Sequence, residues 1–160
     1  TAKNPRYSEG SIVALADGRL LFATTEFADS ASDFAKARII AKTSKDEGVT
    51  WSESQVLQKS VGKLNVMSVT MLRLTNEGLY SGPLGMFYLV KNAHDDLDVW
   101  LKVSNDEGKT FGDAVLVTNQ PGYHVMNNDR VQRLSSGRLV VPVASTPDVS
   151  KDNHFVSKCL

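Results

Sequence analysis

Two eight-residue stretches, "SKDEGVTW" at 44–51 and "SNDEGKTF" at 104–111, are nearly identical and lie about sixty positions apart. In each, the Asp can accept main-chain N–H groups across a turn, and the Gly can adopt the left-handed conformation that side chains resist. The Thr adds a hydroxyl, and the aromatic residue can wedge into a sheet. We therefore interpret both octets as structural turns. Their defining residues are Ser44, Asp46, Gly48, Thr50, Trp51, Ser104, Asp106, Gly108, Thr110 and Phe111.

A calcium loop is the alternative interpretation of the octets. An EF-hand loop needs oxygen ligands at alternate positions and a distant Glu, and neither octet supplies them. The sequence has no Cys/His cluster, and its single cysteine, Cys159, allows neither a disulfide within one chain nor a thiolate zinc site. We expect no metal and no cofactor.

Short β-type segments surround the octets and repeat with them. Apolar runs pair around a turn at 11–27 (Asp17-Gly18), at 70–92 (Gly78, Gly82, Pro83 and Gly85) and at 131–145 (Ser136-Gly137). A third strand is predicted at 37–44, 98–104 and 154–160, and a fourth at 54–58 and 114–118. Four strands per repeat of 40 to 60 residues are typical of propeller blades. We predict an all-β chain with units at 1–61, 62–121 and 122–160, the last incomplete.

Composition narrows the range of partners. The 160 residues hold 18 basic and 18 acidic side chains with no run of like charges, which argues against a surface for nucleic acid. No stretch approaches the length of an apolar membrane span. The chain opens on "TAKNPRYSEG" without a signal-peptide pattern, and it does not indicate a compartment.

The octets resemble the Asp-box, or BNR repeat, of the sialidases (neuraminidases), whose fold is a six-bladed β-propeller. Two further stretches carry the same resemblance. "NPRYSEGSIVALADGRLL" (4–21) resembles the sialidase opening, with an Arg shortly before the first inner strand, and "VQRLSSGRLVVPVA" (131–144) resembles the strand pair of the third blade. The resemblance spans essentially the whole chain, about three four-stranded blades, but only the first half of the family's domain.

The resemblance also implies site residues. In sialidases an arginine triad binds the substrate carboxylate, an Asp is the acid/base, and a Tyr assisted by a Glu is the nucleophile. Arg6 matches the first triad position and Asp33 the acid/base position. The family's further Arg before this Asp is replaced here by Glu26 and Phe27. A neighbouring carboxylate such as Glu26 would help Asp33 to hold a proton.

Propeller geometry gives a second route to site residues, because loops entering the innermost strands converge with the links between second and third strands. The polar groups in these segments are Arg6, Glu9, Asp33, Lys91, Asn92, His94, His124, Asn127, Asn128, Asp129 and Arg130. Each also has a structural interpretation: Asp129 can form a salt bridge with Arg6 or Arg130, and the two histidines can cap loops. Arg73, Arg133 and Arg138 lie within strands and are interpreted as solvated or as inter-blade pairs.

The leading functional hypothesis is a fragment of a sialidase-like glycoside hydrolase that acts on terminal sialic acid or a similar anionic sugar. We expect it to be inactive alone, because the Tyr and Glu of the family belong to later blades. The alternatives are a non-catalytic glycan-binding or scaffold propeller, and a glycosidase of the same fold for another sugar. Because an open blade array exposes apolar faces, we also predict a homodimer that covers them.

Overall fold

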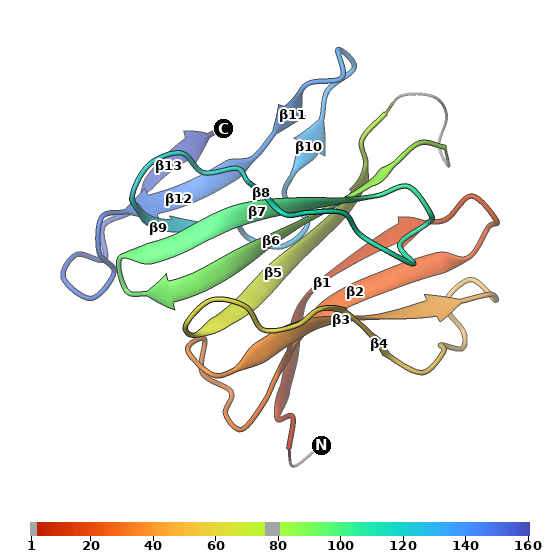
Figure 1. The fold of residues 1–160 in the computed structure, drawn as a ribbon, viewed down its shortest axis with the longest axis horizontal. Coiled ribbons are helices and arrows are strands. Elements are labelled where there is room, and N and C mark those ends of the chain that lie inside the picture. The colour runs from red at the N-terminus through yellow and green to blue at the C-terminus, as the bar shows by residue number, and fades with distance from the viewer. Residues whose placement is uncertain (1–2, 76–80) are drawn as a thin grey trace.

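Every regular element in the described part of the chain is a β-strand (Figure 1). The computed structural model describes residues 3–75 and 81–160, so the turn predicted at Gly78 lies outside it. The strands are β1 (Arg6–Ala14), β2 (Leu20–Phe27), β3 (Ala37–Ser44), β4 (Gln55–Gln58), β5 (Asn65–Arg73), β6 (Leu84–Ala93), β7 (Asp96–Ser104), β8 (Val115–Leu116), β9 (Gly122–Val125), β10 (Gln132–Arg133), β11 (Leu139–Val140), β12 (Pro142–Thr146) and β13 (Val156–Cys159).

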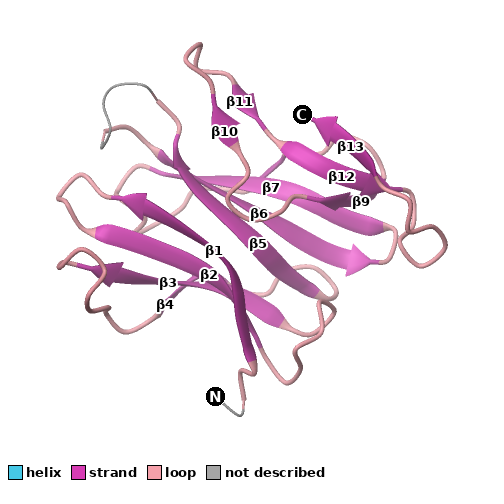
Figure 2. Ribbon diagram, turned by 180° about the vertical axis from the view of Figure 1, so that it is seen from behind, coloured by secondary structure: helices cyan, strands magenta, loops and turns pink. Residues whose placement is uncertain are grey.

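The strands form three neighbouring units, which we name blade one (β1–β4), blade two (β5–β8) and blade three (β9–β13). Blade one is an antiparallel sheet in the order β1-β2-β3-β4. Blades two and three share one sheet in the order β13-β12-β9-β7-β6-β5, with β8 on β7 and a separate β10-β11 pair. Figure 2 shows the same arrangement from behind.

The shared sheet departs from the prediction of one sheet per unit. Asp96 and Leu97 of β7 pair in parallel with Gly122 and Tyr123 of β9. The reason is the shortness of β8, which pairs only with Trp100 and Leu101 of β7. The beginning of β7 is therefore open to β9, and one continuous hydrogen-bonded sheet results. The unit boundaries at 1–61, 62–121 and 122–160 stay predictions.

Two hairpin turns repeat the same geometry, as their sequences predict. The Leu15 N–H donates to the Arg19 carbonyl at 2.8 Å, and the Leu134 N–H donates to the Arg138 carbonyl at 2.8 Å. Their glycines have φ of +84° (Gly18) and +85° (Gly137). Glycine adopts this left-handed region at little cost, so the Asp-Gly and Ser-Gly dipeptides locate both turns.

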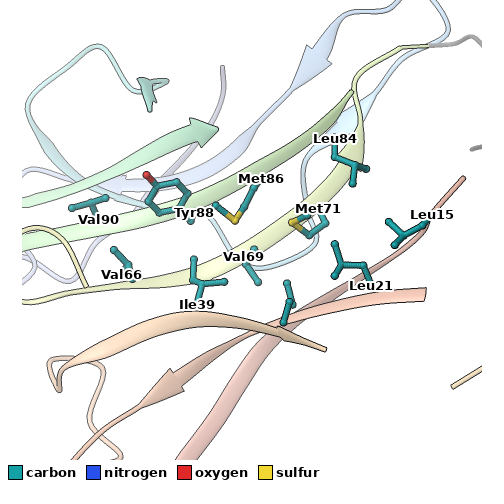
Figure 3. Packing of buried hydrophobic residues seen from close by; sticks show 12 residues of the cluster. Leu15, Leu21, Ile39, Val66, Val69, Met71, Leu84, Met86, Tyr88 and Val90 are labelled. Carbon is teal, nitrogen blue, oxygen red and sulfur yellow. The ribbon is translucent and has the colours of Figure 1, made fainter. Parts of the chain in front are cut away.

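The main core lies between blades one and two (Figure 3). Alternate residues of β2 and β3, such as Leu21 and Ile39, face Val66, Met71 and Tyr88 of blade two. A second buried cluster, which includes Phe87, Leu89, Val99, Tyr123 and Val143, lies between blades two and three. Each blade therefore buries its apolar face against the next one.

Both octets form the same hydrogen-bonded turn. Ser44 Oγ donates to Asp46 Oδ1 at 2.8 Å and accepts from the Gly48 N–H at 2.8 Å. Asp46 accepts from the Thr50 N–H at 2.8 Å and from the Thr50 hydroxyl at 2.5 Å. The second octet repeats the four bonds at 2.8, 2.9, 2.8 and 2.6 Å. The bonds from threonine lower the pKa of Asp46 and of Asp106 to about 2.

The aromatic residues of the two octets have different surroundings. Phe111 packs against the core between blades one and two, as predicted. Trp51 is 37% exposed. Its Nε1 donates to the Gly48 carbonyl at 3.0 Å, and its ring meets the edge of Phe22, 5.8 Å away between ring centroids. The reason is that Phe22 alternates with the core residue Leu21, so the Phe22–Trp51 pair lies on the side of blade one that faces away from blade two.

We call this side the outer face of blade one. Exposed side chains on this face also include Tyr7, Ile12 and Val56. Each is the register partner of a residue on a neighbouring strand that points away from the core between blades one and two. Exposed apolar groups of this kind are common at protein interfaces. The homodimer inferred from the open blades stays a prediction. Analytical ultracentrifugation of the chain at several concentrations measures its oligomeric state.

The two octet glycines offer a matched test of packing between blades one and two. Gly108→Ala is expected to destabilise the fold more than Gly48→Ala. Because φ is +78° and +91°, both variants carry about 1–2 kcal/mol of backbone strain. A Cβ at position 108 would also lie 2.9 Å from Leu21 Cδ2, whereas at position 48 the nearest atom is Trp51 Cζ2 at 3.6 Å. Urea unfolding of both variants measures the difference, and equal losses would contradict the packing argument.

Candidate functional site

The first strand of blade one places Arg6 beside the loop that carries Asp33. Arg6 Nη1 forms an ion pair with Asp33 Oδ1 and donates to the Ala31 carbonyl at 3.0 Å. Arg6 Nε donates to Ser8 Oγ at 2.9 Å, and the guanidinium lies 4.2 Å from the centroid of the Phe27 ring. The Asp33 side chain remains 55% exposed. An oriented cation and an accessible carboxyl group therefore stand together at one edge of the blades.

Glu9 joins this pair through a bulge in β1. Its carboxylate lies 3.6 Å from Arg6 Nη2 and accepts from the Ser68 N–H at 3.2 Å. Glu9 has φ of +61°, and Ser68 and Asp129, each about sixty residues further on, have φ of +57° and +55°. Left-handed conformations are unfavourable for such residues and cluster at functional positions. The repeat therefore places one strained residue at the equivalent point of each blade.

Lys91 supplies a second, buried cation next to Asp33. Its side chain is 1% exposed, and Nζ donates to the Asp33 main-chain carbonyl at 2.9 Å. The ammonium also lies 4.3 Å from the Phe34 ring centroid and 5.4 Å from that of Tyr123. Burial lowers the pKa of Lys91, and the carboxylates of Asp33 and Glu9 oppose part of this shift.

Two buried residues of this cluster, Asn65 and Tyr123, were not predicted from the sequence. Asn65 Nδ2 donates to the carbonyls of Asp33 at 2.9 Å and Ala35 at 2.7 Å. Burial and, to a lesser extent, the Asp33 carboxylate raise the pKa of Tyr123 to about 12. The repeat could have identified Asn65. Asn65 stands before the bulge residue Ser68 at the same interval as Arg6 stands before the bulge residue Glu9.

Comparison with known proteins identifies the architecture. No profile of a protein family and no curated protein sequence matches the chain. Among solved structures, Hadza microbial sialidase Hz136 matches 98% of this chain with a TM-score of 0.76 at 15% identity. Trypanosoma rangeli sialidase, in complex with the inhibitor DANA, matches 96% with a TM-score of 0.70 at 20% identity. The fold is that of the sialidases.

The sialidase-type sheets of this chain form an open array, so the predicted partial propeller is confirmed. The chain spans 35% of the Hadza sialidase and 28% of the Trypanosoma sialidase. It spans 51% of a protein of unknown function from Dyadobacter fermentans, with a TM-score of 0.72 at 14% identity. At these identities the similarity establishes the fold.

In this sialidase-type fold, Glu26 is not a neighbour of Asp33, and that expectation was wrong. Glu26 accepts from the Tyr7 hydroxyl at 3.0 Å and pairs with Arg38 Nε. The cause is strand alternation: Arg6 pairs with Phe27, so the preceding residue Glu26 points to the outer face of blade one. There it lines a cavity of about 510 Å³ together with several basic residues.

Three other predicted residues make mainly structural contacts. Buried His124 places Nδ1 2.9 Å from Ser145 Oγ and Nε2 2.8 Å from the Gln120 carbonyl, because it alternates with Tyr123 on β9. Asn92 accepts from the Lys63 N–H at 2.9 Å and donates to Asp96 at 3.1 Å. The His94 ring lies 4.6 Å from the Phe34 ring, at the rim of the cluster.

The segment 127–130 is divided between two locations. Asp129 accepts from Ser11 Oγ at 2.7 Å, whereas Arg6 forms its ion pairs with Glu9 and Asp33. Asn128 Nδ2 donates to the Gly10 carbonyl at 3.1 Å. Asn127 and Arg130 instead line a cavity of about 320 Å³ on blade three. This segment therefore connects blade three to blade one.

Within residues 3–75 and 81–160, no group of three or more His, Cys, Asp or Glu side chains could hold a metal ion. The same residues include no helix of the length and apolar character needed to cross a membrane.

Proposed function

We propose that this chain carries part of the sugar site of a sialidase-like glycoside hydrolase, with Arg6 binding the carboxylate of a terminal sialic acid or a similar anionic sugar. The observation that supports the proposal is the ion pair between Arg6 and the exposed Asp33. Solved structures with this fold include sialidases in complex with DANA and with sialic acid. A guanidinium presents a fork of N–H groups that matches a carboxylate.

In this proposal the substrate competes with Asp33 for Arg6. The Asp33 carboxylate occupies part of the guanidinium in the ligand-free chain. When a sugar carboxylate takes its place, Asp33 loses its cationic partner and can hold a proton for the departing glycosidic oxygen. Protonation of that oxygen is the acid step of glycoside hydrolysis, as oxocarbenium-like charge develops on the sugar.

We further propose that the chain alone binds such a sugar without hydrolysing it. Burial raises the pKa of Tyr123 to about 12, so its hydroxyl is harder to activate as a nucleophile than that of an ordinary tyrosine. Tyr7 does bond to a glutamate, Glu26, but on the outer face and away from Asp33. Tyr7 of blade one and Tyr123 of β9 therefore do not fit the role of nucleophile beside Arg6.

The test is a calorimetric or NMR titration of the chain with N-acetylneuraminic acid. Arg6→Lys keeps the charge but loses the fork, so affinity is expected to fall at least about tenfold, the equivalent of 1.4 kcal/mol. Arg38→Lys is the matched control, because Arg38 also pairs with a carboxylate of blade one but on its other face. Equal affinity of both variants would overturn the assignment of Arg6.

A fluorogenic sialoside separates binding from hydrolysis. We expect no turnover by this chain, and turnover that Asp33→Ala leaves intact would contradict the proposed roles. Binding of neutral sugars in preference to sialic acid would favour the alternative of a glycan-binding propeller or of a glycosidase for another sugar.

A further inference from the structure

The loop that carries Asp33 belongs to blade one, but blade two holds its main chain. Two donors converge on one atom, the Asp33 carbonyl oxygen: Lys91 Nζ and Asn65 Nδ2, each at 2.9 Å. Asn65 Nδ2 also reaches the Ala35 carbonyl at 2.7 Å. The donors are register partners on β5 and β6, so one rung of blade two contacts both ends of the segment 33–35.

Both donors are buried deeply enough for this contact to matter. Asn65 is 0% exposed and Lys91 is 1% exposed. A buried ammonium is unfavourable unless it is hydrogen-bonded and near compensating charge. Lys91 meets this requirement with a main-chain carbonyl, the Phe34 and Tyr123 rings, and the nearby carboxylates of Asp33 and Glu9. Its burial is a reason to assign it a role other than direct contact with a sugar.

The other side of the same loop is held by Arg6, which binds the Ala31 carbonyl and the Asp33 carboxylate. Asp33 is thus fixed at two atoms from two blades: its carboxylate by blade one and its carbonyl by blade two. Because side-chain direction follows from the main-chain position, the contact from blade two sets where the carboxylate can lie.

We infer that Asn65 and Lys91 are positioning residues for Asp33, which hold the main chain of residues 33–35 so that the Asp33 carboxylate meets Arg6. The inference rests on the proposed function only where it takes Asp33 as the proton donor. It replaces the earlier interpretation of Lys91 as a residue that binds sugar.

The test uses side-chain NMR of Arg6 in the ligand-free chain. Pairing with Asp33 slows rotation of the guanidinium about its Nε–Cζ bond, and the Nη signals report that rate. In Lys91→Met, which keeps the apolar stem but loses the ammonium, we expect rotation to become several-fold faster. Asn65→Leu, a substitution of similar shape, is expected to act in the same direction.

Arg73→Met is the matched control, because it removes another buried cation between blades one and two but makes no contact with the Asp33 loop. A purely structural role for Lys91 would lower the thermal midpoint in both variants and leave the rotation of Arg6 unchanged. Unchanged rotation of the Arg6 guanidinium, in folded Lys91→Met or in Asn65→Leu, would overturn the inference. If Lys91→Met does not fold, Asn65→Leu decides alone.

The outcome is independent of the sugar titration. Failure of the wild-type chain to bind N-acetylneuraminic acid would reject the proposed function, while faster rotation in the variants would still support the positioning role. Binding by the wild type together with unchanged rotation in the variants would reject the positioning role alone.

Discussion

Replacing Glu107 by glutamine is expected to lower the free energy of unfolding by about 3 kcal/mol, because it leaves a buried guanidinium without its counter-charge. Arg73 is 7% exposed and binds both oxygens of Glu107, at 2.7 and 2.6 Å. It also reaches the carbonyls of Gly82 at 2.7 Å and Ala14 at 3.2 Å. The Arg73 side chain therefore links the second octet to Gly82 before β6 and to the end of β1. Its ion pair lies within blade two, and only the bond to the Ala14 carbonyl crosses to blade one.

Removing the other partner is expected to cost less. In Arg73→Met the apolar stem remains, and the orphaned Glu107 side chain, already 28% exposed, can be hydrated. Urea unfolding of both variants measures the asymmetry. The exposed pair of Arg19 and Asp17 is the control: Asp17→Asn is expected to change stability by less than about 1 kcal/mol. A larger loss for Arg73→Met than for Glu107→Gln would contradict this account.

The second large effect is expected at the octet aspartates. Asp106→Ala removes the acceptor for the Thr110 N–H, the Thr110 hydroxyl and the Ser104 hydroxyl. The turn also holds Glu107, which accepts from the Ala16 N–H of blade one at 2.8 Å. Asp46→Ala breaks the same bonds in a turn whose aromatic residue is exposed. We therefore expect Asp106→Ala to lower the thermal midpoint more than Asp46→Ala.

The dependence of stability on acidic pH provides an independent test of the octet turns. The pKa of Asp106 is about 2 in the folded chain, against an ordinary value of 3.8. A carboxyl group with a depressed pKa stabilises the fold fully above its unfolded value and loses this contribution as the pH falls toward 2. In Asp106→Ala the stability curve between pH 4 and 2 should therefore be flatter than in the wild type. An unchanged slope would show that the octet does not contribute in this range.

The strands and turns could be predicted because their signals are local. Asp17-Gly18 and Ser136-Gly137 require positive φ at glycine, and the octets contain donors and acceptors that satisfy one another within a few residues. The pairing of β7 with β9 was missed, because it depends on where the short β8 ends, and strand length is weakly encoded in two apolar residues.

The site was only partly predictable, because it depends on which face each residue occupies. Arg6 and Asp33 meet as their positions in the sequence indicate. Glu26 and His124 point away, because a single step along a strand reverses the face, and the bulge between Ser8 and Ser11 shifts the register of β1. Asn65 was missed because an isolated Asn in an apolar strand gives no sign of which loop it will meet.

Blade one belongs to a different sheet from blades two and three, and in the described residues the two sheets share no strand pair. The contacts across this boundary are side-chain contacts, such as Ser11 with Asp129 and Lys91 with the Asp33 carbonyl. The relative position of the two sheets is therefore held by buried side chains and not by a main-chain ladder. A ligand that contacts Arg6 on one side and blade two or three on the other would act as a non-covalent cross-link. By reciprocity, a change that favours the same relative position of the two sheets also tightens binding of that ligand.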